Sequence, residues 1–146
     1  LACALDQMCT GSNDRMRNPL IKTVALAGLA TAPLLAEPLI TVPSGQSVRF
    51  FEQRDEPESG ITRLRFIAPD LASPLKRPSF EDLTLDLEAL CLEFGLQKLP
   101  PNVRQPVQII VSLSAQPIEF GIANPDVVQV FEAFSVENET CMLEMF

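Results

Sequence analysis

The stretch SFEDLTLDLEALCLEF, residues 79–94, is the strongest helical segment of the sequence and sets the expectation for the fold. Ser79, with Asp82 three residues later, is typical of a helix N-terminus, because the serine oxygen can accept a hydrogen bond from a free backbone N–H. Apolar residues then recur at helical spacing and form one stripe: Leu83, Leu87, Leu90, Cys91 and Phe94. Gly95, followed by a Pro-Pro pair, predicts the end of the helix. The remaining polar residues are expected to form its solvated face: Thr84, Asp86, Glu88 and Glu93.

Two segments before the helix alternate between apolar and polar residues, as half-buried strands do. Residues 47–54 and 61–68 flank the polar stretch RDEPESG (54–60), and together they predict a hairpin with a long loop. The first strand is expected to divide its side chains between two faces: Val48 and Phe50 on one, and Arg49, Phe51 and Gln53 on the other. The second strand turns Leu64 and Phe66 inward, and Arg63 and Arg65 outward.

Residues 107–114 after the helix also alternate, and four apolar residues define their core face: Val107, Ile109, Val111 and Leu113. Ile110 is the exception on the outward face, among Gln108, Ser112 and Ser114. Residues 118–122 predict a short strand. The sequence NPD (124–126) places proline directly after a capping residue, which predicts the start of a short helix. One side of that helix would be apolar: Val127, Val128, Phe131 and Phe134. The final segment predicts a strand, a turn at 137–139 and a last strand that contains Cys141.

The first part of the sequence predicts an export signal. Arg17 and Lys22 precede the uncharged stretch TVALAGLATAPLLA (23–36), and Glu37-Pro38 interrupts the apolar pattern, which is the layout of a secretory signal peptide. The alternatives are a membrane anchor, for which about 20 apolar residues are needed, and a buried helix of the domain, which the Gly and Pro residues of the stretch disfavour.

This signal divides the sequence into three parts. Residues 1–15 are expected to be an upstream extension, residues 16–36 the signal peptide, and residues 37–146 a single mature domain. Cleavage after Ala36 gives the better signal length, and the sequence ATA (30–32) is the alternative site. A domain of this size can bury one modest core, and we expect it to work in the periplasm.

Two cysteines remain in the expected mature domain, and their positions favour one disulfide. Cys91 lies on the apolar stripe of the helix, and Cys141 shares a strand face with Leu143 and Met145, so both thiols are expected to point into the core. Exported chains meet an oxidising environment in which such a pair is oxidised, and two buried free thiols are the alternative. The sequence therefore predicts an α+β domain, with an antiparallel sheet packed against one main helix and a Cys91–Cys141 disulfide.

The composition argues against several classes of function. The net charge of −8 disfavours nucleic acid and anionic membrane surfaces, which attract clustered Lys and Arg. The absence of histidine removes Ser-His and Cys-His catalysis and histidine metal ligation. The acidic run of Asp55, Glu56 and Glu58 lacks the spacing of a dedicated calcium loop, and the sequence contains no phosphate-binding glycine loop or nucleophile elbow. We therefore expect no cofactor and no metal.

The predicted sheet carries the candidate partner-binding residues. Arg63 and Arg65 lie on an outward strand face, with Arg49 and Phe51 on the neighbouring strand, and the arginines form the only basic patch of the predicted domain. Arginine is enriched at interfaces, so this patch could receive an acidic partner. Cross-strand pairing with acidic side chains is the alternative.

Six segments resemble a family of uncharacterised exported proteins of alphaproteobacteria: VPSGQ (42–46), LRFIAPD (64–70), the Cys91 helix, VSLSAQPIEFG (111–121), NPDVVQVFEAF (124–134) and CMLEMF (141–146). The resemblance spans nearly all of the expected mature domain. It implies export and the disulfide, and it implies no chemistry. Some similar sequences are named acetolactate synthase, but a domain of this size lacks room for that much larger thiamine-diphosphate enzyme.

These observations lead to one functional hypothesis with two alternatives. The leading hypothesis is a non-catalytic periplasmic module that binds a protein partner or an envelope component. A small carboxylate-dependent hydrolase is the first alternative, and it needs two carboxyl groups in different environments. Its candidate carboxylates are Asp82, Asp86, Glu93, Glu119 and Glu132. A purely structural or stabilising envelope protein is the second alternative.

Overall fold

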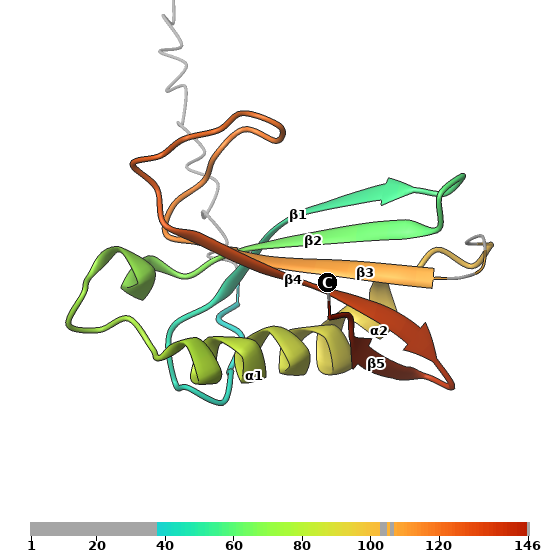
Figure 1. Cartoon of the computed structure of the whole chain (residues 1–146), viewed down its shortest axis with the longest axis horizontal. Coiled ribbons are helices and arrows are strands. Elements are labelled where there is room, and N and C mark those ends of the chain that lie inside the picture. The colour runs from blue at the N-terminus through green and yellow to red at the C-terminus, as the bar shows by residue number, and fades with distance from the viewer. Residues whose placement is uncertain (1–37, 103–104, 106, 146) are drawn as a thin grey trace, which may run out of the picture. The chain divides into compact units, whose positions relative to one another are not determined.

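The computed structural model describes residues 38–102, 105 and 107–145 (Figure 1). The main elements of this part of the chain are β1 (Arg49–Glu56), β2 (Ile61–Ile67), α1 (Phe80–Leu90), α2 (Leu96–Lys98), β3 (Val107–Ser114), β4 (Gln129–Glu137) and β5 (Thr140–Leu143). A 3-10 turn, Pro69–Ala72, precedes α1, and a π-helical turn, Cys91–Gly95, joins α1 to α2. The predicted signal peptide lies outside the described residues. Within them, no helix is long and apolar enough to cross a membrane.

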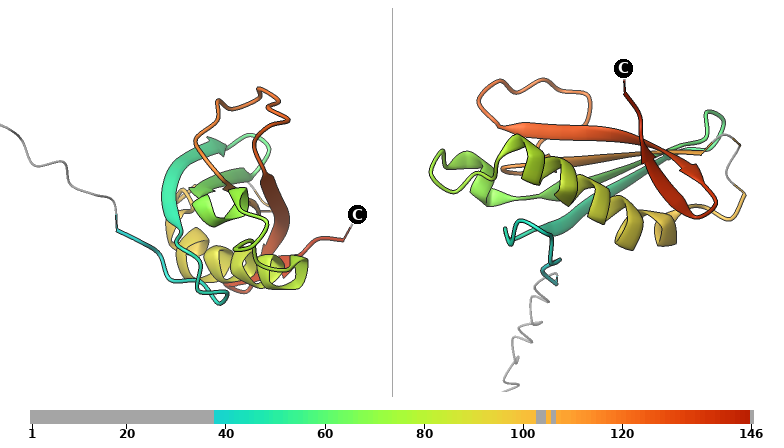
Figure 2. Two further views of the ribbon diagram at one scale, coloured as in Figure 1. Left: turned by 90° about the vertical axis from the view of Figure 1, so that its left-hand side faces the viewer. Right: turned by 60° about the horizontal axis from the view of Figure 1, so that its bottom comes forward.

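The five strands form one sheet in the order β1-β2-β3-β4-β5. The β1–β2, β3–β4 and β4–β5 pairs are antiparallel, and the β2–β3 pair is parallel. Because parallel neighbours need a crossover connection, the chain passes through α1 and α2 before it returns as β3. The helix covers one face of the sheet, and residues 115–128 curve over the opposite side (Figure 1, Figure 2). The predicted α+β fold with one main helix is confirmed, and the sheet contains one parallel pair within its mostly antiparallel order.

The helix begins at the predicted residue and ends later than predicted. The Ser79 hydroxyl oxygen accepts a hydrogen bond from the Asp82 backbone N–H at 3.1 Å, as a capping residue does. At Gly95, the predicted end, the backbone is still helical with a φ of −63°, and α2 continues to Lys98. A Cβ atom at Gly95 would lie 3.2 Å from Cδ1 of Leu64 on β2. The glycine is therefore explained by close packing of the helix on the sheet, and not by a helix terminus.

A β-bulge at Phe51 changes the faces that the sequence predicts for β1. Between Phe50 and Glu52 the pairing advances by two residues on β1 and by one on β2, so Phe51 is the extra residue. Beyond the bulge the alternation is shifted. Gln53 lies on the helix side, where its Nε2 donates to the Lys98 carbonyl oxygen at 3.0 Å. The prediction that Gln53 shares a face with Phe51 was wrong, because a two-residue period does not continue through a bulge.

The core lies between the helix and the sheet. Its largest fully buried side chains include Leu64, Phe66, Leu87, Leu90, Ile109, Leu113 and Phe134. The rings of Phe50, Phe66 and Phe94 contact one another, with centroids 5.1–5.7 Å apart. Cys91 and Cys141 are buried and form the predicted disulfide, with Cα atoms 6.2 Å apart and a separation of 50 residues in sequence. The bond links the helix to the last strand through the core.

The segment after β3 differs most from its prediction. The strand expected at 118–122 is a loop, and the helix expected after Asn124 is replaced by β4. Asn124 does form a local turn, since its Oδ1 accepts a hydrogen bond from the Asp126 N–H at 3.1 Å. β4 then pairs with β3 at eight consecutive positions, and its β-branched and aromatic residues favour that pairing over a helix. The predicted turn at 137–139 is confirmed and joins β4 to β5.

Candidate functional site

The loop at residues 115–128 folds back over the sheet face that the helix leaves uncovered, which we call the open face. The loop and the open face enclose a pocket of about 300 Å³. β2 and β3 contribute Arg63, Arg65, Ile110 and Ser112 to its lining, and the loop and β4 contribute Phe120, Ile122 and Phe131. A pocket of this volume lies at the lower end of the range for small-ligand sites.

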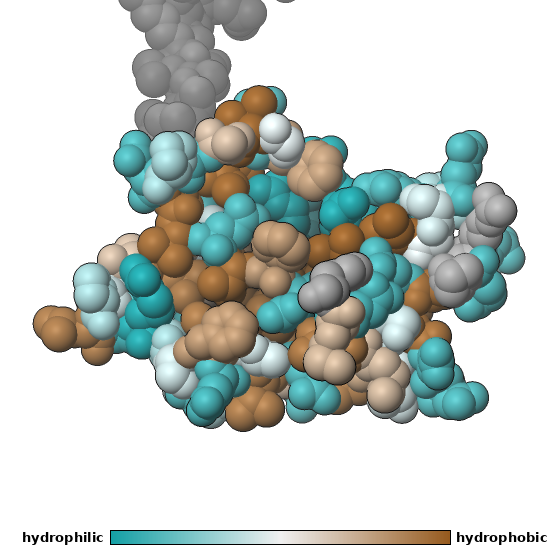
Figure 3. Space-filling model, viewed as in Figure 1, coloured by the Kyte–Doolittle hydropathy of each residue, from teal (hydrophilic) through white to brown (hydrophobic). Residues whose placement is uncertain are grey.

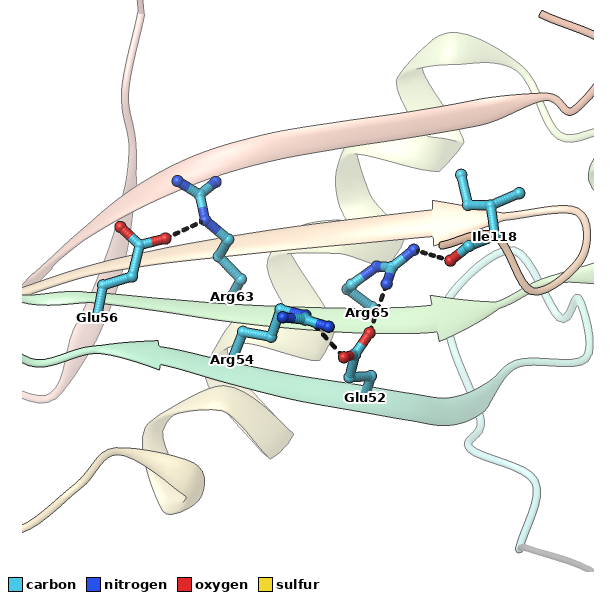
Figure 4. Close-up of polar contacts among 6 residues, drawn as sticks. All are labelled: Glu52, Arg54, Glu56, Arg63, Arg65 and Ile118. Atoms are coloured by element: carbon cyan, nitrogen blue, oxygen red, sulfur yellow. Dashed lines mark hydrogen bonds and ion pairs between the residues drawn. The ribbon is translucent and has the colours of Figure 1, made fainter. Parts of the chain in front are cut away.

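Arg65 holds the loop to the sheet. Its side chain is buried, and its Nη2 donates to the Ile118 carbonyl oxygen at 2.6 Å (Figure 4). Its Nη1 pairs with Oε2 of Glu52 on β1, and the other oxygen of Glu52 pairs with Arg54 at 2.7 Å. Both Nη groups of Arg65 therefore have partners inside the protein, and one of those partners belongs to the loop.

Phe120 adds a second contact between the loop and the sheet. Its ring centroid lies 4.5 Å from Cζ of Arg54, 5.7 Å from Cζ of Arg65 and 5.9 Å from Cζ of Arg63. The negative face of an aromatic ring attracts a guanidinium cation. The loop is therefore positioned both by this ring and by the hydrogen bond to its backbone.

Arg63 presents its Nη edge to the pocket. Its Nε donates to Oε1 of Glu56 at 2.7 Å, and this bond holds the pKa of Glu56 below its ordinary value. Neither Nη group of Arg63 has a hydrogen-bond partner among the described residues. Figure 4 shows the Nη end reaching over β3 toward β4, away from Glu56. Arg63 thus has one edge fixed by the protein and the other directed to the pocket that it lines.

Glu52 lies between two arginines. Desolvation on the open face raises the pKa of Glu52, but the hydrogen bonds and charges of Arg54 and Arg65 outweigh it, so the net pKa lies below the ordinary value. The carboxylate is therefore held in its charged form, as the centre of the ion pairs that tie β1 to β2 and, through Arg65, to the loop.

Acid is expected to weaken this contact. A carboxyl group whose pKa is lowered by folding stabilises the fold above its unfolded pKa of about 4.3, and that contribution is lost as the pH falls through the folded pKa. Thermal unfolding at about pH 5 and about pH 3 should therefore show a larger loss of stability for the wild type than for Glu52→Gln, which is uncharged at both values. Equal losses in the two proteins would contradict the role given to Glu52.

Apolar side chains surround the arginines. Phe131 on β4 is 67% exposed, Ile122 on the loop is 59% exposed and Phe120 is 42% exposed. Figure 3 shows hydrophobic surface on the loop and hydrophilic surface between the loop and the sheet. A concave site that combines apolar walls with a few polar groups is typical of ligand binding.

The structure brings two of the four predicted binding residues into the pocket, Arg63 and Arg65. Phe51 lies beside the pocket, with its ring centroid 5.3 Å from Cζ of Arg65. Arg49 is exposed on β1 and does not line the pocket. Both pocket arginines also pair with glutamates of β1, which was the alternative prediction for them.

Sequence reasoning missed the part of the site that the loop and β4 supply. The pattern predicts a strand around Phe120 and a helix at Phe131, so neither residue was expected near the arginines. Ser112 and Ser114 were expected to face outward, and they are buried at 7% and 4% exposure because the loop covers them. Ile110 is the one apolar residue on the outward side of its strand, and in the sequence it is the one indication that this face is covered.

Asp86 is the clearest correction among the candidate carboxylates. The sequence predicts it on the solvated face of the helix, but it is fully buried. Its Oδ1 accepts a hydrogen bond from the Ser44 backbone N–H at 2.8 Å, and its Oδ2 accepts from the Ser44 hydroxyl and from Gln46 Nε2, both at 2.6 Å. These bonds replace the water that a buried carboxylate loses. Asp86 therefore anchors the segment before β1 to the helix.

The other candidate carboxylates do not gather into a catalytic pair in the pocket. Asp82 accepts a hydrogen bond from the Ser79 hydroxyl at the helix N-terminus, and among the described residues Glu119 is the sole carboxylate that lines the pocket. In the part of the chain that the structure describes, no group of three or more Cys, Asp or Glu side chains is placed to hold a metal ion.

Comparison with known proteins places the chain in a family. A family model matches residues 22–146, a range that contains the whole sheet and helix. Neither a curated protein nor a solved structure matches the chain. Because the matched range covers most of the sequence, the chain belongs to the family of unknown function DUF6497.

Proposed function

We propose that this protein is a non-catalytic binding module that works outside the cytoplasm, in the cell envelope. The observation that carries the proposal is the pocket between the loop and the open face, where the Nη edge of Arg63 meets exposed apolar side chains. Apolar surface that gathers around a concave site, instead of being scattered singly, is typical of an interaction site.

The distribution of carboxylates favours binding over hydrolysis. Acid/base hydrolysis needs two carboxyl groups in different environments, whereas Glu119 is the one carboxylate that the described part of the chain contributes to the pocket lining. Asp86 lies on α1, and both of its oxygens are occupied by hydrogen bonds from Ser44 and Gln46. We therefore propose no catalytic role for these groups.

The proposed location rests on the N-terminal sequence and on the disulfide. Residues 16–36 have the layout of a signal peptide, and a buried disulfide is typical of oxidising compartments such as the periplasm. Protein recovered from the periplasm with the mass of residues 37–146 would support this location. Full-length protein retained in the cytoplasm would exclude it.

A capture experiment tests binding at the pocket. Immobilised, disulfide-bonded protein is exposed to periplasmic extract from the organism that produces it, and retained components are identified by mass spectrometry. We expect a component that the wild type retains and that Phe131→Ser retains about tenfold less, because the substitution removes apolar contact area at the pocket.

Leu75→Ser is the matched control for this capture, because Leu75 is 97% exposed and lies before α1, outside the pocket. The control should retain the same component as the wild type. If all three proteins retain every component equally, the pocket is not a binding site. A purely structural role in the envelope then becomes the better explanation.

A further inference from the structure

We propose, building on the binding function above, that the pocket binds a single carboxylate group attached to an apolar body of aromatic or branched aliphatic character. Three features of the described residues support this ligand class. They are the donor edge of Arg63, the charge balance of the open face, and the apolar wall next to Arg63.

The donor edge of Arg63 has the geometry that a carboxylate needs. Glu56 engages the Nε side of the guanidinium at 2.7 Å, which restricts the plane of the group. The two Nη groups, without partners among the described residues, then form a planar fork that matches both oxygens of a carboxylate. Arg65 offers no such fork, because its Nη groups are bonded to Glu52 and to the Ile118 carbonyl oxygen.

The charge balance of the open face disfavours ligands that carry more than one negative charge. The three clustered arginines are matched by the carboxylates of Glu52 and Glu56 and by Glu119 in the pocket lining. A phosphate would bring a second negative charge, and the other arginine of the pocket lining, Arg65, is already bonded to Glu52 and to the Ile118 carbonyl oxygen. A carboxylate brings one charge and gains two charge-assisted hydrogen bonds from Arg63. The net charge of −8 on the chain also disfavours polyanions.

The apolar wall begins directly beside Arg63. Ile110 is the β3 partner of Arg63, and Phe131 on β4 is the partner of Ser112, one step further along the same face. Ile122 of the loop contributes to the same pocket. A carboxylate bound to Arg63 therefore places its neighbouring carbon atoms against these side chains. The volume of about 300 Å³ suits a body of roughly one aromatic residue.

The ligand class is tested by titrating the ¹⁵N-labelled, disulfide-bonded full chain with N-acetyl-L-phenylalanine and following the spectrum by NMR. We expect saturable shifts of the Arg63 Nε–H signal and of backbone amides that line the pocket. N-acetyl-L-phenylalaninamide has the same body without the charge and should bind at least about tenfold more weakly, because it loses a charge-assisted pair.

Substitutions test whether Arg63 supplies the positive charge that binds the carboxylate. Arg63→Gln should weaken binding of the acid by the same factor of at least about ten. Arg63→Lys keeps the charge without the planar fork, and its affinity should fall between those of Arg63→Gln and the wild type. Lys76→Gln removes a cation outside the pocket and should leave the affinity unchanged. A thermal transition close to that of the wild type confirms that each variant is folded.

The peptide acetyl-Ala-Ala-Phe with a free C-terminus distinguishes two sources of the carboxylate. Binding of both probes supports a small free acid as ligand, and binding of the peptide alone supports the C-terminal residue of a polypeptide. Equal affinity for the acid and its amide, or unchanged affinity of Arg63→Gln, would overturn the carboxylate assignment. Absence of binding by both probes would also overturn it. A Phe131-dependent component in the capture experiment would then show that the binding function stands and that only the ligand class is wrong.

Discussion

Asp86→Ala is expected to lower the free energy of unfolding by about 3 kcal/mol. The carboxylate accepts three hydrogen bonds, two from Ser44 and one from Gln46, and a bond to a charged group contributes about 1.5–3 kcal/mol. Alanine removes every acceptor and leaves the donors of this partly buried segment without a partner. Its better helix propensity recovers only about 0.6 kcal/mol.

The destabilisation by Asp86→Ala should extend to the segment that leads into β1. The segment that Asp86 holds contains a turn, in which the Gly45 N–H donates to the Val42 carbonyl oxygen at 2.9 Å. Val42 and Val48 on either side of the Asp86 contact are buried in the core. If the polar anchor is lost, both valines lose part of the restraint that keeps them there, and amide exchange from Val42 to Val48 should increase.

Asp86→Asn is the matched variant that separates shape from charge. The Oδ1 of the asparagine can still accept a hydrogen bond from the Ser44 N–H. Gln46 Oε1 is a buried atom without a hydrogen-bond partner among the described residues. If the Gln46 amide rotates by half a turn, this oxygen can accept a hydrogen bond from the asparagine Nδ2. We therefore expect a loss of only about 1 kcal/mol. Denaturant unfolding followed by circular dichroism measures both variants, since the chain lacks Trp and Tyr.

Glu93→Ala, at an exposed position in the π-helical turn that follows α1, is the control and should stay within about 0.5 kcal/mol of the wild type. An Asp86→Ala protein as stable as the wild type would show that the segment before β1 is held by apolar packing alone. An Asn variant as unstable as the Ala variant would show that the negative charge, and not the arrangement of donors and acceptors, stabilises this contact.

The elements whose apolar and polar pattern lies within a short stretch of sequence could be predicted. The helical stripe of α1 and the alternation of β2 and β3 lie within short windows of sequence, and the turn at Asn138 and Glu139 adopts the positive φ values, 49° and 60°, of a tight hairpin. The disulfide could be expected from the faces on which Cys91 and Cys141 lie. The parallel pairing of β2 with β3 had no local signal, because it depends on the crossover through the helix.

The elements that depend on distant partners were not predictable in the same way. Asp86 has the polarity of a solvated residue, and its partners lie 40 and 42 positions earlier in the chain. The Asn124 signal correctly marks a turn, but pairing with β3 makes the next segment a strand instead of a helix. The sequence predicts Arg65 on an outward strand face, but it does not predict the bond to the Ile118 carbonyl oxygen, 53 positions away, that holds the loop to that face. The sequence pattern identifies residues of this site, but it does not show that the loop folds back over them.

The double variant Cys91→Ala/Cys141→Ala is expected to lose about 4 kcal/mol of unfolding free energy, because the bond closes a loop of 50 residues whose entropy it removes from the unfolded state. Domains of this kind have about 5–15 kcal/mol in total, so the loss is a large share of the stability. Denaturant unfolding of the double variant and of the wild type, with and without a reductant, measures it. The intact mass of the wild type should rise by about 2 Da on reduction, as expected when one disulfide opens.

The loss of local stability should be greatest at β5, because its four residues contribute little to the core apart from the cysteine. Met142 and Leu143 are 52% and 42% exposed, and the Glu144 N–H is bonded to the Ala133 carbonyl oxygen at 2.9 Å. In the double variant, we expect amide exchange to increase more at Glu144 than in the middle of β3. Met142→Ala with the disulfide intact is the control, and its stability should stay within about 0.5 kcal/mol of the wild type. If reduced and oxidised protein unfold at the same denaturant concentration, and Glu144 stays protected in both, then pairing with β4 alone holds the last strand, and the stabilising role given to Cys91–Cys141 is wrong.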